Sequence, residues 1–175
     1  MNQTVVPFQP GDATDRAGAV AHARAEAPKH EGARRALFNL QAACGDLPPV
    51  DCPLQHVFAP GMYLRTIFIP AGTFLVGKIH KHQHGNILSQ GHVRVFTEGG
   101  GVKELHGPVT MVSAPGTKRA VFAVTDTVWS TIHLNPTNET DLAKIEADVI
   151  APTYADYEQF LLGENAMTKS IEVAA

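Results

Sequence analysis

The sequence predicts an all-β domain, a barrel or sandwich of short strands, with helical segments before and after it. Between residues 61 and 134, short runs of β-branched and aromatic residues alternate with turn residues at close spacing, and no helical pattern interrupts them. The 175-residue length suits one domain with extra terminal segments, and 44% hydrophobic with 18% charged residues is typical of a soluble globular protein. The runs are MYLRTIFI, FLVGKIH, NILSQGHVRVFT, VKELH, VTMVS, RAVFAV and TVWSTIHL.

The charge and the termini argue against several classes of partner. A formal net charge of -3 without a Lys/Arg run argues against nucleic acid and against an anionic membrane surface. The sequence shows neither a signal-peptide pattern nor an apolar stretch of membrane-spanning length. We therefore expect a cytoplasmic protein, with Cys44 and Cys52 as free, buried thiols.

Residues 1–56 are predicted to form an N-terminal arm rich in alanine, proline and charge. An alanine-rich stretch near its start lacks a large apolar face, so it would not fold as a helix by itself. A helix is predicted over residues 31–44, because Leu37 and Leu40 fall on one helical face and Gly45 follows as a stop. The next stretch, 47–60, carries four prolines and is expected to be irregular.

The barrel domain is predicted over residues 57–136, and a C-terminal helical segment and tail over residues 137–175. A helix should begin after Asn138, carry an apolar stripe and end at Pro152. The aromatic residues after this proline predict one or two further helical turns that pack on the barrel, and the last dozen residues are expected to fray.

Three of the nine histidines stand close together as His80-Lys-His82-Gln-His84. The flanking runs both have strand character, which predicts a hairpin centred on His82 with His80 opposite His84. Two neutral imidazoles facing each other across a hairpin can share a metal ion, whereas His82 at the tip should point outward. The alternative for such histidines is a solvated or hydrogen-bonded structural role.

A second predicted hairpin supplies a third candidate ligand. RAVFAV and VWSTIH flank a short turn, so Arg119 should lie opposite His133. If the two hairpins meet, His80, His84 and His133 would hold a divalent metal, zinc, iron or manganese, with open coordination positions. Arg119 cannot ligate a metal, so it would bind an anionic ligand, pair with an acidic residue or extend out of the barrel.

Trp129 is predicted to pack in the core or at the rim. The other histidines are expected at the surface or in loops: His22, His30, His56, His92 and His106.

The segment from Gly72 to Gly91 resembles the first motif of the cupin family, which carries two histidines, then Glu or Gln, then glycine. In this alignment His84 occupies the Glu/Gln position, His80 the second histidine and Lys78 the first. The resemblance implies a single cupin-type jelly-roll β-barrel with a metal site in its interior.

The segment MVSAPGTKRAVF resembles the second cupin motif, with Gly116 at the glycine and Arg119 at the last metal histidine. Two of the four usual ligands are therefore replaced. A rearranged site of three histidines would survive only if His133 compensates for Arg119.

Roughly residues 60–153 are similar to small cupin-like proteins encoded by tailed phages. This resemblance implies a structural or accessory virion or assembly component, located in the host cytoplasm or the virion. It also implies a homo-oligomer, and the arm 1–56 is the segment expected to contact other phage proteins.

Two functions of other classes stay open: a metal-dependent cupin enzyme, as oxygenase, isomerase or hydrolase, and a small-ligand-binding module. No catalytic residue is assigned, because acidic side chains are scarce within the strand runs. Glu98 and Glu104 flank a glycine-rich turn and are expected to be solvated.

Overall fold

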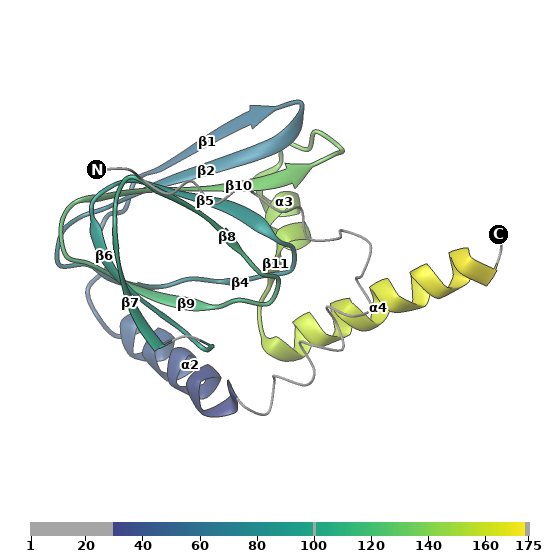
Figure 1. Cartoon of the computed structure of the whole chain (residues 1–175), viewed down its shortest axis with the longest axis horizontal. Coiled ribbons are helices and arrows are strands. Elements are labelled where there is room, and N and C mark those ends of the chain that lie inside the picture. The colour runs from purple at the N-terminus through teal and green to yellow at the C-terminus, as the bar shows by residue number, and fades with distance from the viewer. Residues whose placement is uncertain (1–29, 100, 174–175) are drawn as a thin grey trace, which may run out of the picture.

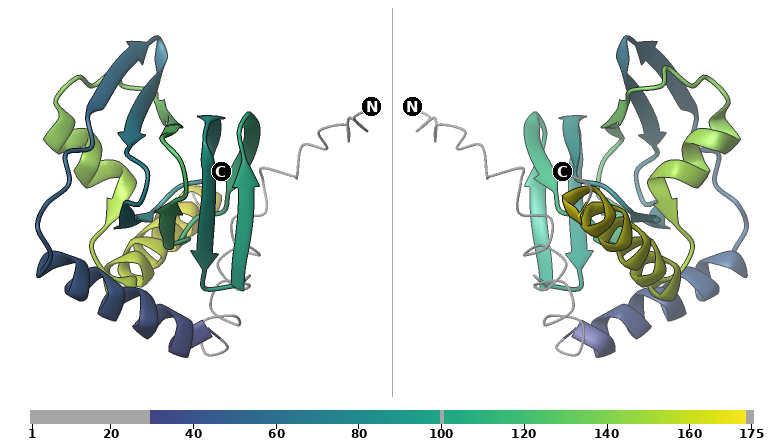
Figure 2. Two further views of the ribbon diagram at one scale, coloured as in Figure 1. Left: turned by 90° about the vertical axis from the view of Figure 1, so that its left-hand side faces the viewer. Right: turned by 90° about the vertical axis from the view of Figure 1, so that its right-hand side faces the viewer.

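The computed structural model describes residues 30–99 and 101–173, with side chains described up to residue 164. It consists of two facing antiparallel sheets with helices at one end and one side (Figures 1 and 2). One sheet has the strand order β1-β2-β10-β5-β8, the other β3-β9-β6-β7, and a short pair β11-β4 lies beside them. The strands are β1 Leu54–Ala59, β2 Gly61–Ile69, β3 Phe74–Val76, β4 Ile79–His80, β5 His84–Gln90, β6 His92–Thr97, β7 Gly101–His106, β8 Val109–Ser113, β9 Arg119–Ala123, β10 Thr127–Asn135 and β11 Ile150–Ala151.

The core lies between the two sheets. Leu88 and Trp129 from the five-stranded sheet pack with Val93, Val95 and Val121 from the other sheet, and all five are buried. This arrangement agrees with the predicted all-β class. Within the described residues the pairings form separate sheets, so they do not show a closed barrel.

Strand β1 corrects one expectation, because it lies in the proline-containing stretch predicted to be irregular. Its six residues fall between Pro53 and Pro60 and contain no proline. They pair along their full length with β2, from Leu54 opposite Ile67 to Ala59 opposite Met62. Since β1 is an edge strand, prolines at its two ends remove no interior hydrogen bond of the sheet.

The run NILSQGHVRVFT forms two strands, because the chain changes sheets at Gly91. Strand β5 belongs to the five-stranded sheet and β6 to the four-stranded sheet. Gly91 has a φ of 108°, and a Cβ there would lie 2.4 Å from the Oγ1 of Thr127. Only glycine combines this backbone conformation with so close an approach.

Helix α2, Glu31–Gly45, lies over the segment predicted as a helix and covers the sandwich beside β3. Leu37 is fully buried, whereas Leu40, predicted on the same face, is 39% exposed. Lys118 fixes the helix: its Nζ donates to the Oε1 of Gln41 at 2.6 Å and lies 4.8 Å from the ring centre of Phe38. The alanine-rich stretch before this helix lies outside the described residues.

Helix α3, Leu142–Val149, begins at Asp141, whose carboxylate accepts a hydrogen bond from the backbone N–H of Ala143. Ile145 and Val149 of this helix are buried against Tyr63 of β2. This packing brings β11, which directly follows the helix, to pair with β4. Helix α3 therefore helps to position His80, the last residue of β4.

Helix α4, Tyr154–Val173, is longer than the one or two turns predicted, since no proline after Pro152 interrupts it. Its first turns pack on the domain through Tyr157, which is buried with Ile79 and Ala151. The hydroxyl of Tyr154 donates a hydrogen bond to Glu98. The carboxylate of Glu98 is only 13% exposed and also pairs with Arg34, so the prediction that Glu98 is solvated is wrong.

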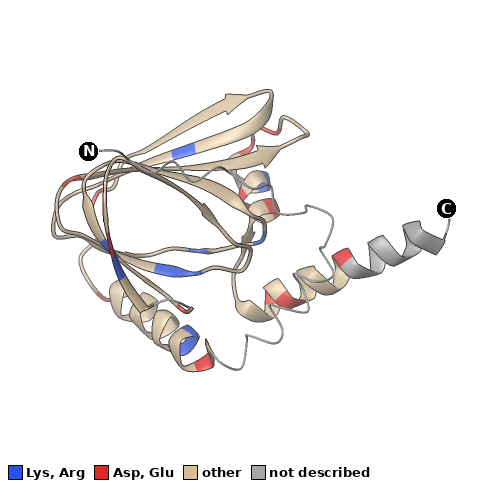
Figure 3. Cartoon of the chain, in the orientation of Figure 1, with Lys and Arg blue, Asp and Glu red and all other residues tan. Residues whose placement is uncertain are grey.

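Charged residues of both signs are interspersed over the described strands and helices (Figure 3). None of the described helices is both long and apolar enough to cross a membrane. The two cysteines, Cys44 and Cys52, are free thiols, although both are partly exposed rather than buried.

Candidate functional site

Two histidines meet at the end of the ladder between β5 and β10. Ile132 is paired with Gly85, so the neighbouring residues His133 and His84 lie next to each other on the inner face of the sheet. Both side chains are buried, and their ring centres are 5.0 Å apart.

The third histidine comes from a different ladder. His80 is paired with Ile150 of β11, and its carbonyl oxygen accepts a hydrogen bond from the N–H of Gly116 at 2.8 Å. Its ring centre lies 4.1 Å from that of His84 and 5.1 Å from that of His133. One ring nitrogen from each histidine lies within 4.8 Å of the others. The structure thus brings together the three histidines singled out from the sequence.

The hairpins used to reach this grouping are wrong. Strand β4 pairs with β11 and not with β5, and β9 pairs with β3 and β6 and not with β10. Arg119 consequently lies opposite Thr97, and His133 opposite Tyr63. The physical reason is that β4 and β5, like β9 and β10, belong to different sheets, so the turn within each pair carries the chain from one sheet to another.

Burial makes the three imidazoles poor bases. It is the largest cause that lowers the pKa of His80, to about 2, and that of His133, to about 4, and His84 adds repulsion in both cases. Burial also lowers the pKa of His84, although the carbonyl oxygen of His82 beside its ring acts in the opposite direction. The three rings are therefore uncharged at neutral pH, and each keeps a nitrogen lone pair that can bind a metal ion.

One nitrogen of the cluster has no partner. Among the described residues, the Nδ1 of His80 is buried without a hydrogen bond. A buried polar atom in this state costs free energy unless another species satisfies it. Three neutral ring nitrogens around an unsatisfied buried position form a donor set that fits a divalent ion of the zinc, iron or manganese type.

A polar network extends from the histidines into the interior. Asn86, two residues after His84 on the same face of β5, donates to the Oγ of Ser113 at 2.7 Å. It also accepts a hydrogen bond from the Nε1 of Trp129 at 3.1 Å. The guanidinium of Arg119 donates to the same Ser113 hydroxyl. The alternation of β5 could have indicated Asn86, because it places Asn86 on the face of His84.

Arg119 lies inside the sandwich. Its Cζ is 5.9 Å from the ring centre of Trp129, which is only 6% exposed and packs in the core as predicted. Its positive charge contributes to the lowered pKa values of His80 and His84. Arg65 acts on His80 in the same way from the opposite sheet, and Figure 3 shows cationic segments on both β2 and β9. The site therefore combines neutral nitrogen donors with positive charge.

The two residues next to the cluster point elsewhere. Lys78, which the resemblance to the first cupin motif placed at a ligand position, is 58% exposed and forms an ion pair with Glu146. His82 is exposed, as predicted, and its ring contacts that of Phe160 at a centroid distance of 5.3 Å. Neither side chain belongs to the site.

Tyr63 supports the cluster from the neighbouring strand. Its buried ring lies 6.0 Å from that of His133, and its hydroxyl is hydrogen-bonded to the Nδ1 of His56 at 2.7 Å. His56 therefore lies on an edge strand, half-buried, with a partner that the sequence did not indicate. The register between β1 and β2 is needed to find this contact, because the stretch containing His56 has no predicted strand.

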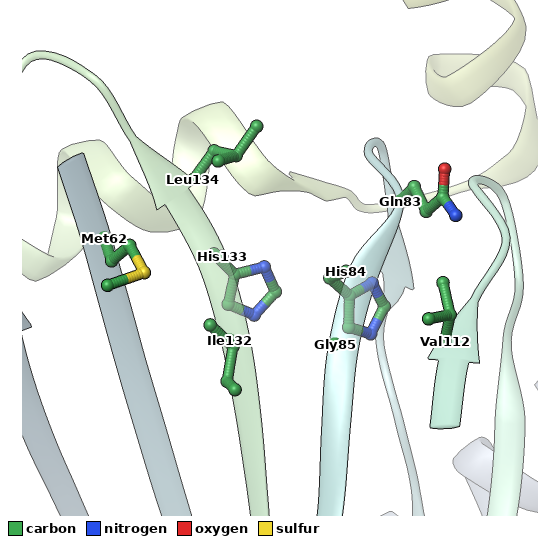
Figure 4. Close-up of a pocket in the computed structure, with 8 residues that line it drawn as sticks. All are labelled: Met62, Gln83, His84, Gly85, Val112, Ile132, His133 and Leu134. Carbon is green, nitrogen blue, oxygen red and sulfur yellow. The ribbon is translucent and has the colours of Figure 1, made fainter. Parts of the chain in front are cut away.

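A pocket of about 240 Å³ reaches His84 and His133 at the rim of the sandwich. Figure 4 shows their rings at the ends of neighbouring strands, with Met62 and Leu134 to one side and Val112 to the other. The lining is apolar apart from the two histidines and one amide, and it consists of Met62, Gln83, His84, Gly85, Val112, Ile132, His133 and Leu134.

No family model and no curated protein matches the sequence. Among solved structures, the chain is similar to ectoine synthase from P. lautus, at 15% identity and a TM-score of 0.47, over 61% of this chain and 79% of that one. It is also similar to a cupin 2 domain-containing protein from Halorhodospira halophila, at 19% identity and a TM-score of 0.42, over 59% of this chain and 82% of that one. A third similar structure is that of KdgF from Halomonas sp., at 16% identity and a TM-score of 0.44, over 56% of this chain and 90% of that one. Because these identities and scores are low, the functional argument rests on the residues of the site.

Proposed function

We propose that this chain is a divalent-metal-binding protein of cupin type, whose site accepts a small anionic ligand next to the metal. His80, His84 and His133 would hold the ion, and Arg119 would bind the anion. The observation that carries the proposal is the convergence of three buried, uncharged imidazoles, whose nitrogens lie within 4.8 Å of one another. When bound, such an ion supplies Lewis acidity and an open coordination position.

The unsatisfied His80 Nδ1 supports a metal over a purely structural histidine cluster. In a structural cluster, each buried ring nitrogen would be expected to have a hydrogen-bond partner. Here the rings are stacked on one another, and stacking satisfies no lone pair. A cation shared by the three rings would satisfy the lone pair of this nitrogen.

We expect the metal-stripped protein to bind Zn²⁺ or Mn²⁺ in a titration calorimeter, and the variant His133→Gln to bind at least about 100-fold more weakly at this site. The magnitude follows because loss of a partner that only orients a ligand already costs roughly 10–100-fold in affinity. His80→Gln should have the same effect. Both glutamines keep a polar side chain of similar size, and circular dichroism would verify the fold.

The matched control is His82→Gln, which removes an exposed histidine between two candidate ligands. Its binding curve should match that of the unmodified protein. Equal affinity in the control, His80→Gln and His133→Gln proteins would contradict the metal site.

Arg119 provides the basis for an anionic ligand. A guanidinium inside the sandwich is held by the neutral hydroxyl of Ser113, and burial lowers its pKa. A buried charge is stabilised best by an opposite charge, and the planar guanidinium matches a carboxylate or a phosphate. This positive charge would also repel a bare metal ion, so an anion between them would favour both.

We expect malonate to bind the zinc-loaded protein, and Arg119→Gln to weaken that binding by roughly 10- to 100-fold, the value of one charge-assisted hydrogen bond. Calorimetry with malonate measures this directly. Arg35→Gln, a change at an exposed arginine of α2, is the control and should leave the affinity unchanged. If the Arg119 variant binds malonate as tightly as the control, Arg119 is not the anion-binding residue.

The structural or accessory role in a tailed phage stays a prediction from sequence resemblance. Nothing in the structures named above connects the chain with a phage. The first 29 residues of the arm expected to contact other phage proteins lie outside the described residues. The homo-oligomer is likewise a prediction.

A further inference from the structure

A second group of metal-ligating side chains lies on the outer face of the four-stranded sheet, away from the first cluster. His92 of β6 is directly opposite His106 of β7, and Glu104 is two residues before His106. Side chains two residues apart lie on the same face of a strand. Val93 and Val95 of β6 point the other way, into the core. The three polar side chains therefore share the face turned away from the core.

The three side chains are close enough to share one ion. One donor atom from each of His92, Glu104 and His106 lies within 4.8 Å of the others. The two imidazole rings are stacked at a centroid distance of 3.9 Å, and the Nε2 of His92 is 3.4 Å from the Oε2 of Glu104. The sequence predicted His92 and His106 at the surface or in loops and indicated no partner for them, because a cross-strand pair becomes visible only when the register is known.

One nitrogen of the His92 ring lacks a hydrogen bond among the described residues. Its Nε2 is buried and has no hydrogen bond among the described residues, although the Glu104 carboxylate is close. This nitrogen thus lies beside a carboxylate oxygen and a second imidazole without the directional bond that would satisfy it. A cation between the three groups would provide it.

Arg94 orients the carboxylate of Glu104 toward His92. Its Nε donates to the Oε1 of Glu104 at 2.8 Å, which leaves Oε2 on the side of His92. The same hydrogen bond is the main cause that lowers the pKa of Glu104, so the carboxylate stays ionised. Hydrogen bonds of this kind, from a residue that does not itself touch the ion, orient the carboxylate ligands of metal sites.

We propose that His92, Glu104 and His106 form a second metal site, which takes a zinc-class divalent ion and ties the edge strand β7 to β6. Two imidazoles and one carboxylate suit Zn²⁺, whereas Mg²⁺ and Ca²⁺ prefer ligand shells made of oxygen. A fourth tetrahedral position is left for water or another ligand. The site does not depend on the proposed function, because it shares no residue with the first cluster.

The test is a zinc titration of the full-length, metal-stripped protein and of the double variant His92→Gln/His106→Gln. Both positions are on the outer face, so the fold should be retained. We expect the double variant to bind one ion fewer per chain, and excess zinc to raise its melting temperature less than that of the unmodified protein. His82→Gln should keep the full stoichiometry. Magnesium should give no binding heat at the second site.

Equal zinc stoichiometry in the double variant and the unmodified protein would overturn this site. The outcome is separable from the test of the first cluster, because His133→Gln removes a different ion. In the triple variant His92→Gln/His106→Gln/His133→Gln, we expect both ions to be lost. In ¹H–¹⁵N spectra of the His133→Gln protein, zinc should still shift the ring signals of His92 and His106, and unchanged ring signals would also overturn the proposal.

Discussion

The metal-free protein is expected to lose about 6 kcal/mol of folding free energy between about pH 6.5 and about pH 4. The pKa of His80 is lowered from 6.5 to about 2 and that of His133 to about 4. The unfolded chain therefore binds more protons than the folded chain below about pH 6.5. The free energy of unfolding consequently decreases as the pH is lowered. Above that pH both states carry neutral rings, so these groups add no pH dependence. Each pH unit costs about 1.4 kcal/mol per histidine until the folded-state pKa is reached.

A loss of this size would be a large part of a typical domain stability of roughly 5–15 kcal/mol. Urea unfolding with a chelator present, at neutral pH and at about pH 4, measures it. The variant His80→Gln/His133→Gln should show a much shallower pH dependence, because two of the titrating buried rings are gone. His82→Gln, at an exposed ring, should behave like the unmodified protein. Parallel pH profiles for the double variant and the unmodified protein would show that the rings are not buried in solution.

Substitution of Gly91 by alanine is expected to destabilise the fold by about 3 kcal/mol or more, through a strained φ and an overpacked contact. The residue has a φ of 108°, and a Cβ would lie 2.8 Å from both the carbonyl oxygen of Asp126 and the Cα of Thr127. These are backbone atoms, and Thr127 is fully buried, so neither can move without disturbing the start of β10. Thermal or urea unfolding of the purified variant checks this.

Gly61→Ala separates the two causes. Gly61 also has a positive φ, 75°, but a Cβ at this position would meet nothing within 4 Å. It should therefore show only the backbone cost, about 1 kcal/mol. If the two variants are equally stable, the close approach at Gly91 is not tight in solution, and the chain does not need glycine where it changes sheets.

Local patterns determined much of the architecture. The alternation of β-branched and aromatic residues, with turn residues between the runs, predicted the all-β class, because that alternation is itself the burial pattern of a two-layered sheet. Helix α3 was also predictable, although it begins at Leu142 and not directly after Asn138, since a capping carboxylate and an apolar stripe are local features. Strand β1 was missed because prolines at its ends were taken to affect the residues between them.

Strand pairing was beyond local patterns. The candidate ligands His80, His84 and His133 were chosen through two hairpins that do not exist, and they nevertheless converge. They do so because alternation along each strand places these side chains on the inner face, whichever strand pairs with it. The same limit explains why Ser113 was missed as the partner of Arg119, and why His92 and His106 were taken for unpartnered surface residues.

The sequence by itself determined that the chain forms strands that carry His80, His84 and His133, and its resemblance to the cupin motifs implied that Lys78 and Arg119 replace two ligands. Only the tertiary structure decided which residues share a site. Periodicity is a property of neighbours in the chain, whereas a metal site depends on distances between strands that are remote in sequence. His80, held by β11 after helix α3, depends on the packing of the last third of the chain. The second cluster, by contrast, follows from the register of a single hairpin, β6 with β7.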